Sequence, residues 1–210
     1  MTGPLLEALA SFEALRAVVV GDAMLDVYLH GRTGRLCPEA PVPVVAVGAD
    51  VAAPGGAANA AVNLRALGAE TILVSAVGDD AEGRRLLELL ADRGVDAAAT
   101  IVRPGRGTLT KTRVLADDHL LLRFDAGDVT PIRGKDERAL RERLDELVAD
   151  ADLVLVSDYG YGVVTPGVIS ALPRTGPPVA VDAKDLAPYR TLGPTVVKPN
   201  FAQAARMLGG

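Results

Sequence analysis

The sequence predicts an α/β fold, in which an open, mainly parallel sheet is flanked by helices and carries a small antiparallel β lid. Short apolar runs alternate with helical patterns along most of the chain, which is typical of a parallel sheet. Hydrophobic residues make up 49% of the sequence but aromatic residues only 3%. A core of Val, Leu, Ile and Ala is typical of buried parallel strands covered by helices.

Five apolar runs are predicted to be strands of the main sheet. In chain order they are residues 17–21 (AVVVG), 72–78 (ILVSAVG), 153–158 (LVLVSD), 179–182 (VAVD) and 195–200 (TVVKPN). The stretches between them carry helix-boundary residues: Asp80, Thr165 and Asn200 are expected as N-caps. Pro166 suits the first helical position, and Gly94 is expected to end the helix that Asp80 begins.

Two segments break the alternation of strands and helices. Residues 28–51 are rich in Gly and Pro, and residues 101–125 alternate polar and apolar side chains around a turn at residues 117–118. Neither follows a helical period, and Pro disfavours a central strand in the first segment. We expect both to form the lid, within a single domain of residues 1–210.

Composition narrows the class of protein. The net charge of -5 gives no overall electrostatic footprint for nucleic acid or for an acidic membrane surface, so neither is expected as a partner. No run is long and apolar enough to span a bilayer, and the N-terminus lacks a signal-peptide pattern. The single Cys37 excludes an intrachain disulfide. We therefore expect a cytoplasmic protein, and no residue is assigned as a metal ligand.

Polar side chains follow each predicted strand. Asp22 and Asp26 follow the first, Asp79 and Asp80 follow the second, Asp158 ends the third, Lys184 follows the fourth and Asn200 ends the fifth. Ligands of open α/β sheets bind at the carboxyl ends of the strands, so together these groups outline a polar site. The alternative explanation is helix capping, which is favoured for Asn200 and for Asp80 when each is taken singly.

The stretch VAAPGGAANAAVNLRALG (residues 51–68) opens a helix on Gly55 and Gly56. The two glycines would let the backbone approach a ligand closely and expose N–H groups at the helix start. Asn59, one turn later, offers both a donor and an acceptor to a hydroxyl-rich molecule. A tightly packed small-residue helix, whose glycines serve only the turn, explains the stretch equally well.

A family resemblance favours the first explanation. GGAANAAVNLRALG resembles the N-terminal signature of the ribokinase (pfkB) family of carbohydrate kinases. With VVVGDAMLDVYLHG, PEAPVPVV, TKTRVL, VSDYGYG, VDAK and VKPN in the same order, the chain resembles the kinase domain of bacterial heptose enzymes, often fused to an adenylyltransferase. The resemblance implies a ribokinase-like fold and ATP- and Mg²⁺-dependent phosphorylation of D-glycero-β-D-manno-heptose 7-phosphate at O1.

The same resemblance implies roles for residues at matching positions. Substrate-binding roles fall on Asp26, Gly55, Gly56, Asn59 and Asp158, and roles on the nucleotide side fall on Lys184, Asn200 and Gln203. Lys111 and Arg113, in the lid, are candidates for the 7-phosphate because cations there could pair with it. Solvated charges on a strand face explain Lys111 and Arg113 equally well.

Three departures from the family pattern stand out. Gln203 replaces the Glu of the Asn-x-x-Glu motif, and Tyr161 stands where the heptose subgroup usually has Lys. The Gly-Ala-Gly-Asp run that supplies the catalytic base is expected downstream of Gly210, so the chain resembles the N-terminal two-thirds of a kinase. No catalytic residue is therefore assigned, and activity of the 210 residues alone is not expected.

Two alternatives to the heptose kinase stay open from the sequence. The chain could be a catalytically inactive module that binds a sugar phosphate, or a kinase of the same family for a different sugar. Exposed edges of the lid sheet also indicate a homodimer formed through the lid.

Overall fold

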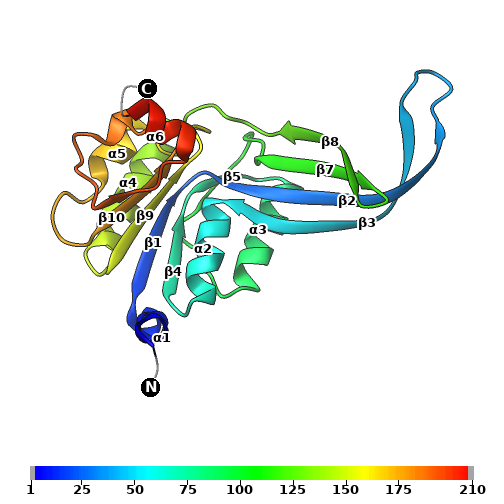
Figure 1. Ribbon diagram of the computed structural model, residues 1–210. Helices are drawn as coiled ribbons and strands as arrows, with labels where there is room; N and C mark the ends of the chain where they lie inside the picture. Colours follow the sequence, from blue (N-terminus) through cyan, green and yellow to red (C-terminus); the bar gives the residue numbers. More distant parts are fainter. Residues whose placement is uncertain (1–2, 208–210) are drawn as a thin grey trace.

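A five-stranded parallel sheet forms the body of the molecule in the computed structural model, which describes residues 3–207 (Figure 1). The strand order is β11-β10-β9-β1-β4, and every neighbouring pair runs parallel. The bounds are β1 (Arg16–Gly21), β4 (Glu70–Val74), β9 (Leu153–Asp158), β10 (Val179–Ala183) and β11 (Val196–Val197). The predicted parallel sheet is confirmed.

Helices cover both faces of this sheet because successive strand residues point to opposite sides. Val18 and Val20 of β1 join the core beneath α4 (Lys135–Val148) and α5 (Pro166–Ala171), whereas Val19 joins the core beneath α2 (Ala57–Ala66) and α3 (Ala81–Ala91). The remaining helical elements are α1 (Pro4–Ala10), η1 (Ser11–Ala14), η2 (Ala187–Tyr189) and α6 (Phe201–Met207). Within residues 3–207, none of the helices combines the length and apolar character that a membrane crossing requires.

The predicted helix boundaries agree with the hydrogen bonds. Asp80 Oδ1 accepts the Gly83 N–H at 2.7 Å, and Thr165 Oγ1 accepts the Val168 N–H at 3.2 Å, with Pro166 opening α5. After α3, Gly94 has a φ of 70° and donates its N–H to the Ala91 carbonyl at 2.9 Å. Residue type at each helix end therefore predicted these caps correctly.

The lid is a separate four-stranded sheet that projects from the carboxyl edge of the main sheet (Figure 1). Its order is β3-β2-β7-β8, from β2 (Ala23–Leu36), β3 (Pro43–Gly56), β7 (Thr110–Ala116) and β8 (His119–Ala126). The pairs β2–β3 and β7–β8 are antiparallel hairpins, but β2 and β7 run parallel. The sheet is consequently mixed rather than antiparallel.

The lid also has different limits from the predicted ones of residues 28–51 and 101–125. β2 begins at Ala23 and β3 continues to Gly56, so the lid grows directly out of the end of β1 and leads into the start of α2. Residues 101–103 form β6 (Ile101–Arg103), which pairs with β5 (Ala76–Gly78) in a two-stranded sheet outside the lid.

The run at residues 72–78, predicted as one strand, is divided between β4 and β5. The division falls at the buried Ser75, whose hydroxyl donates to the Gly21 carbonyl at 2.7 Å and accepts the Ala23 N–H at 3.2 Å. Ser75 thereby binds the junction of β1 and β2, and the chain leaves the main sheet after it.

Candidate functional site

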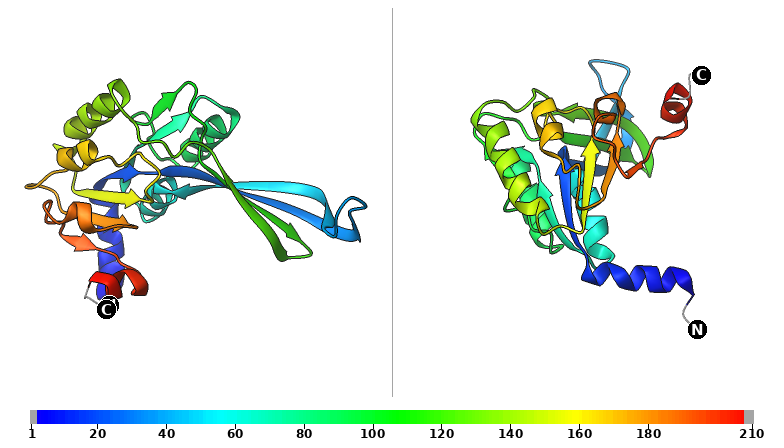
Figure 2. Two further views of the ribbon diagram at one scale, coloured as in Figure 1. Left: turned by 90° about the horizontal axis from the view of Figure 1, so that it is seen from above. Right: turned by 90° about the vertical axis from the view of Figure 1, so that its left-hand side faces the viewer.

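The carboxyl ends of the parallel strands bring polar side chains to one edge of the sheet. Asp22 follows β1, Asp158 ends β9, Lys184 follows β10 and Lys198 follows β11. Figure 2 shows the lid strands leaving from this same edge. In the lid, β2 carries Asp26 opposite Lys111 of β7.

Asp26 and Arg113 form an ion pair on the lid. Arg113 Nη1 donates to Asp26 Oδ1 at 2.6 Å, and about a fifth of each side chain is exposed, 23% for Arg113 and 20% for Asp26. The guanidinium lies 5.0 Å from the centroid of the Tyr28 ring. The hydrogen bond to Asp26 raises the pKa of Arg113. Asp26 therefore has a fixed orientation and retains a second carboxylate oxygen for a ligand.

Gly55 and Gly56 are required by their neighbours. A Cβ on Gly55 would overlap the Asp26 carboxylate, and Gly56, with a φ of 59°, passes against the Asp22 carbonyl. The Ala57 N–H at the start of α2 donates to that carbonyl at 3.0 Å. The glycines thus serve both a turn and the close approach of backbone to a carboxylate. Asn59 is exposed on the first turn of α2.

Lys111 and Lys184, assigned from the sequence to different ligands, meet at Tyr161. Lys111 Nζ donates to Asp125 Oδ2 at 2.8 Å and to Tyr161 Oη at 3.0 Å. Lys184 Nζ lies 4.5 Å from the centroid of the Tyr161 ring. Although burial lowers the pKa of Lys111, its hydrogen bonds to Asp125 and Tyr161 outweigh burial and raise it. Lys111 therefore stays charged.

Asp22 holds the loop that carries Tyr161. Its carboxylate is fully buried and accepts the N–H groups of Tyr159 at 2.8 Å, Tyr161 at 3.0 Å and Val163 at 3.0 Å. Burial raises the pKa of Asp22, and the three N–H donors only partly oppose it. The sequence placed Asp22 at the site but gave it no role; its position directly after a buried strand was the available signal.

Arg106 holds the same loop from the other side. Only 4% of Arg106 is exposed, and its guanidinium donates to the Thr130 carbonyl at 2.8 Å and the Tyr161 carbonyl at 3.3 Å. A buried arginine of this kind leaves no signal in residue spacing, because both acceptors are backbone groups far along the chain. Sequence reasoning missed it for that reason.

Asp158 is anchored from within the core. Its Oδ2 accepts the Tyr189 hydroxyl at 2.6 Å and its Oδ1 accepts the Gly160 N–H at 2.8 Å. Tyr189 is 1% exposed, and burial together with Asp158 raises the pKa of its phenol. Two donors therefore fix the half-buried Asp158 carboxylate at the end of β9.

On the predicted nucleotide side, Asn200 and Gln203 cap α6. Asn200 Oδ1 accepts the Gln203 N–H at 2.9 Å, and Gln203 Oε1 accepts the Asn200 N–H at 2.7 Å, which is a capping box. The capping role of Asn200 is confirmed. Gln203 Nε2 also donates to the Ala183 carbonyl at 3.0 Å and the Lys184 carbonyl at 3.3 Å. A carboxylate at 203 could not make these last two bonds.

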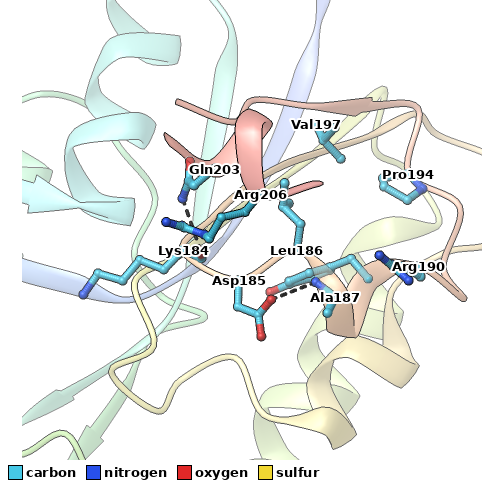
Figure 3. Close-up of a pocket in the computed structure, with 10 residues that line it drawn as sticks. Lys184, Asp185, Leu186, Ala187, Arg190, Pro194, Val197, Gln203 and Arg206 are labelled. Atoms are coloured by element: carbon cyan, nitrogen blue, oxygen red, sulfur yellow. Dashed lines mark hydrogen bonds between the residues drawn. The ribbon is translucent and has the colours of Figure 1, made fainter. Parts of the chain in front are cut away.

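A hollow of about 440 Å³ lies between α6 and the end of β10. Figure 3 shows Gln203 and Arg206 extending from α6, while the Lys184 side chain points away from the other labelled residues. The positive charge of the hollow therefore comes from Arg190 and Arg206, against one carboxylate from Asp185, whereas the Lys184 ammonium lies near the Tyr161 ring. This surplus of cations fits the phosphates of ATP.

Among residues 3–207 no group of three or more His, Cys, Asp or Glu side chains is placed to hold a metal ion. Mg²⁺ that entered with a nucleotide would need few protein ligands, because phosphate oxygens and waters would supply most of its coordination.

The lid-bearing parallel body and its polar strand-end edge define a ribokinase-like protein, and solved structures agree. Escherichia coli phosphofructokinase-2 in complex with potassium matches with a TM-score of 0.73 at 22% identity over 93% of this chain and 63% of its own. Arabidopsis thaliana ribokinase complexed with ribose and ATP matches with a TM-score of 0.66 at 22% identity, over 93% of this chain and 63% of its own. At these identities the likeness concerns the fold.

The chain belongs to the pfkB family of carbohydrate kinases, whose sequence pattern matches residues 14–209. It is 42% identical over 201 residues to the bifunctional protein HldE of Trichlorobacter lovleyi, covering 93% of this chain and 40% of the relative. It is 40% identical over 204 residues to the bifunctional protein HldE of Caulobacter vibrioides, covering 95% of this chain and 41% of the relative. The chain thus spans about two-fifths of the length of these relatives.

Proposed function

We propose that the chain is the sugar-binding part of an ATP-dependent kinase that phosphorylates heptose 7-phosphate at O1, forming the 1,7-bisphosphate. The observation that carries the proposal is the Asp26–Arg113 pair, fixed at 2.6 Å on the lid face above the strand ends, with Lys111 beside it. Resemblance to the HldE proteins supports heptose phosphate as the sugar. Like the activity, the cytoplasmic location is a prediction.

The residues at the site divide the work between sugar and phosphate. The free oxygen of Asp26 accepts hydrogen bonds from sugar hydroxyls, and Asp158 and Asn59 offer further polar groups at the same edge. Lys111 supplies positive charge for the 7-phosphate. The hollow between α6 and the end of β10 would hold ATP with Mg²⁺, and ATP would supply the transferred phosphoryl group. Positioning and electrostatic stabilisation account for most of catalysis in phosphoryl transfer, and these residues provide both.

The direct test mixes the 210-residue chain with ATP, Mg²⁺ and heptose 7-phosphate and follows products by phosphorus NMR. Calorimetric titration of the same chain with heptose 7-phosphate runs in parallel, with D26N as the variant that removes the sugar-binding carboxylate. Bisphosphate formation supports the kinase. Binding that D26N weakens, without turnover, supports the sugar-binding role of these residues, and it fits both a kinase whose catalytic base lies outside the 210 residues and the inactive sugar-phosphate module. Tighter binding of ribose or fructose 6-phosphate supports a different sugar, and binding of no sugar refutes the proposal.

We also propose that the protein forms a homodimer through the lid. β8 and β3 are the edge strands of the lid sheet, and every residue of β8 is exposed. Among them, Leu120 is 58% exposed, Leu122 56% and Phe124 47%, an apolar surface that a second lid could cover. Sedimentation analysis should give a dimer for the parent chain and a monomer for the L122D/F124D variant. A monomeric parent would refute the dimer.

A further inference from the structure

Tyr161 contacts two ammonium groups that come from different parts of the fold. Lys111 on β7 lies with its Nζ 4.9 Å from the ring centroid and hydrogen-bonded to the hydroxyl at 3.0 Å. Lys184, after β10, lies with its Nζ 4.5 Å from the same centroid. The Tyr159 ring stacks beside Tyr161 at 6.2 Å and an angle of 14°. One aromatic ring therefore lies between the lid and the main sheet.

The backbone of Tyr161 is held on both sides by buried charged groups. Its N–H donates to the fully buried Asp22 carboxylate at 3.0 Å, and its carbonyl accepts from the Arg106 guanidinium at 3.3 Å. Because both partners are inside the protein, the ring projects from a fixed point. Lys111 and Lys184 have long, flexible side chains, so the fixed ring determines where their ammonium groups gather.

Lys111, one of the two cations at the Tyr161 ring, shares its carboxylate partner with a third cation. Asp125 pairs with Lys111 at 2.8 Å, but Arg123 also pairs with Asp125, at 2.9 Å. A cation is attracted to the face of an aromatic ring, which partly offsets the mutual repulsion of the two lysines. The Lys111 hydrogen bond, helped by the charges of Lys111 and Lys184, outweighs burial and lowers the pKa of the Tyr161 phenol. A hollow of about 100 Å³, lined by Lys111, Asp125 and Tyr161, adjoins the ring.

We propose that Tyr161 is a positioning residue that gathers the ammonium groups of Lys111 and Lys184 into one binding site for a phosphate dianion. The inference rests on the proposed function and specifies where a phosphate is held. The phosphate comes either from the phosphorylated sugar or from the terminal phosphate of the nucleotide. Tyr161 stands at the position where the heptose subgroup usually carries one lysine. In this chain the ring at that position orients two lysines instead.

The test is calorimetric titration of the 210-residue chain and its variants with four probes: heptose 7-phosphate, unphosphorylated heptose, ATP and inorganic phosphate. Y161A removes both lysine contacts, and we expect it to weaken binding of the phosphate-bearing probe about 10- to 30-fold. Y161F keeps the ring and loses only the hydroxyl, so we expect it to weaken binding of the same probe by about 3- to 10-fold. Unphosphorylated heptose should bind all variants within about twofold.

Y159F is the matched control, because it removes a hydroxyl from the ring that stacks on Tyr161 without touching either lysine contact. It should bind every probe like the parent. Thermal melting checks that each variant is folded, and if Y161A unfolds, Y161F decides the outcome. A purely structural role for Tyr161 would weaken binding of both forms of heptose equally, so the ratio between phosphorylated and unphosphorylated heptose is the discriminating quantity.

The probes also identify the source of the phosphate. Loss of heptose 7-phosphate affinity alone assigns the site to the sugar phosphate, and loss of ATP affinity alone assigns it to the nucleotide. If the parent binds no sugar but binds inorganic phosphate in a Tyr161-dependent way, the phosphate site stands and the proposed function fails. The inference is overturned if Y161F and Y161A bind every phosphate-bearing probe like the parent, or if the parent binds none of them.

Discussion

Replacing Gly55 with Ala tests whether the backbone of β3 sets the position of Asp26. A Cβ at residue 55 would overlap the Asp26 carboxylate and would also lie 2.8 Å from Met24 Cγ. Met24 is buried, with 2% of its surface exposed, so it has little room to move. The added methyl group therefore has to displace the carboxylate of Asp26.

The displacement breaks or lengthens the 2.6 Å ion pair with Arg113. A displaced Asp26 carboxylate can no longer accept a hydrogen bond from a sugar hydroxyl in the proposed site. Hydrogen bonds to charged groups contribute about 1.5–3 kcal/mol, so G55A should weaken heptose 7-phosphate binding about 10- to 100-fold. Overpacking should lower the free energy of unfolding by about 1–3 kcal/mol. Calorimetric titration measures the first quantity, and urea denaturation the second.

Gly48 provides the matched control because it lies on the same strand with its nearest atom, the His30 carbonyl oxygen, 4.0 Å from the added Cβ. G48A should bind heptose 7-phosphate like the parent and unfold at a similar or slightly higher urea concentration. If G55A binds and unfolds like G48A, then the close approach of β3 does not position Asp26, and the reasoning fails.

Three further substitutions test the groups beneath the site by urea denaturation. D22N should lower the free energy of unfolding by about 1–3 kcal/mol, because either orientation of the amide leaves at least one backbone N–H without an acceptor. An unchanged free energy of unfolding would contradict this reasoning. Y189F should cost about 1–3 kcal/mol by removing the buried donor to Asp158, and a loss below 0.5 kcal/mol, roughly, would show that water replaces it. Burial raises the pKa of Asp80, but hydrogen bonds from Thr108 and Gly83 outweigh it, so the pKa lies below the ordinary 3.8. The ionised Asp80 therefore stabilises the folded chain above about pH 4, and this stabilisation is lost as the pH falls through the native pKa. The difference in free energy of unfolding between the parent and D80N should consequently narrow in acid. A difference that stays constant with pH would exclude this linkage.

The sequence predicted best those features that depend on neighbouring residues. The strand at 153–158 agrees with β9, and the caps at Asp80, Thr165 and Asn200 are all present. In each case the deciding interaction joins residues a few positions apart, so residue type and spacing carry the information.

Features that depend on distant residues were not predictable in the same way. The parallel pairing of β2 with β7 joins Asp26 to Lys111, and nothing near either residue specifies it. Gln203 was assigned to the nucleotide from its position in a motif, but its amide binds the carbonyls of Ala183 and Lys184. Such contacts depend on which strands become neighbours, a result of the whole fold.

In the candidate site, single residues could be selected from the sequence, but the contacts between them could not. Family resemblance selected Asp26 and Gly55 separately, and the structure brings the backbone of Gly55 so close to Asp26 that an added Cβ would overlap the carboxylate. Resemblance also assigned Lys184 to the nucleotide and charge alone suggested Lys111 for a phosphate. Only the fold reveals that Tyr161 lies between the two lysines.

The buried Asp22 has a consequence for the order of folding. Its three N–H donors lie 137 to 141 residues further along the chain, in the loop from Tyr159 to Val163. Contacts between such distant residues require a large loop to close first, and they form slowly. During synthesis, β1 and the first lid hairpin leave the ribosome long before this loop exists. The Asp22 carboxylate must therefore remain hydrated until Val163 has emerged, and it becomes buried only when β9 docks beside β1.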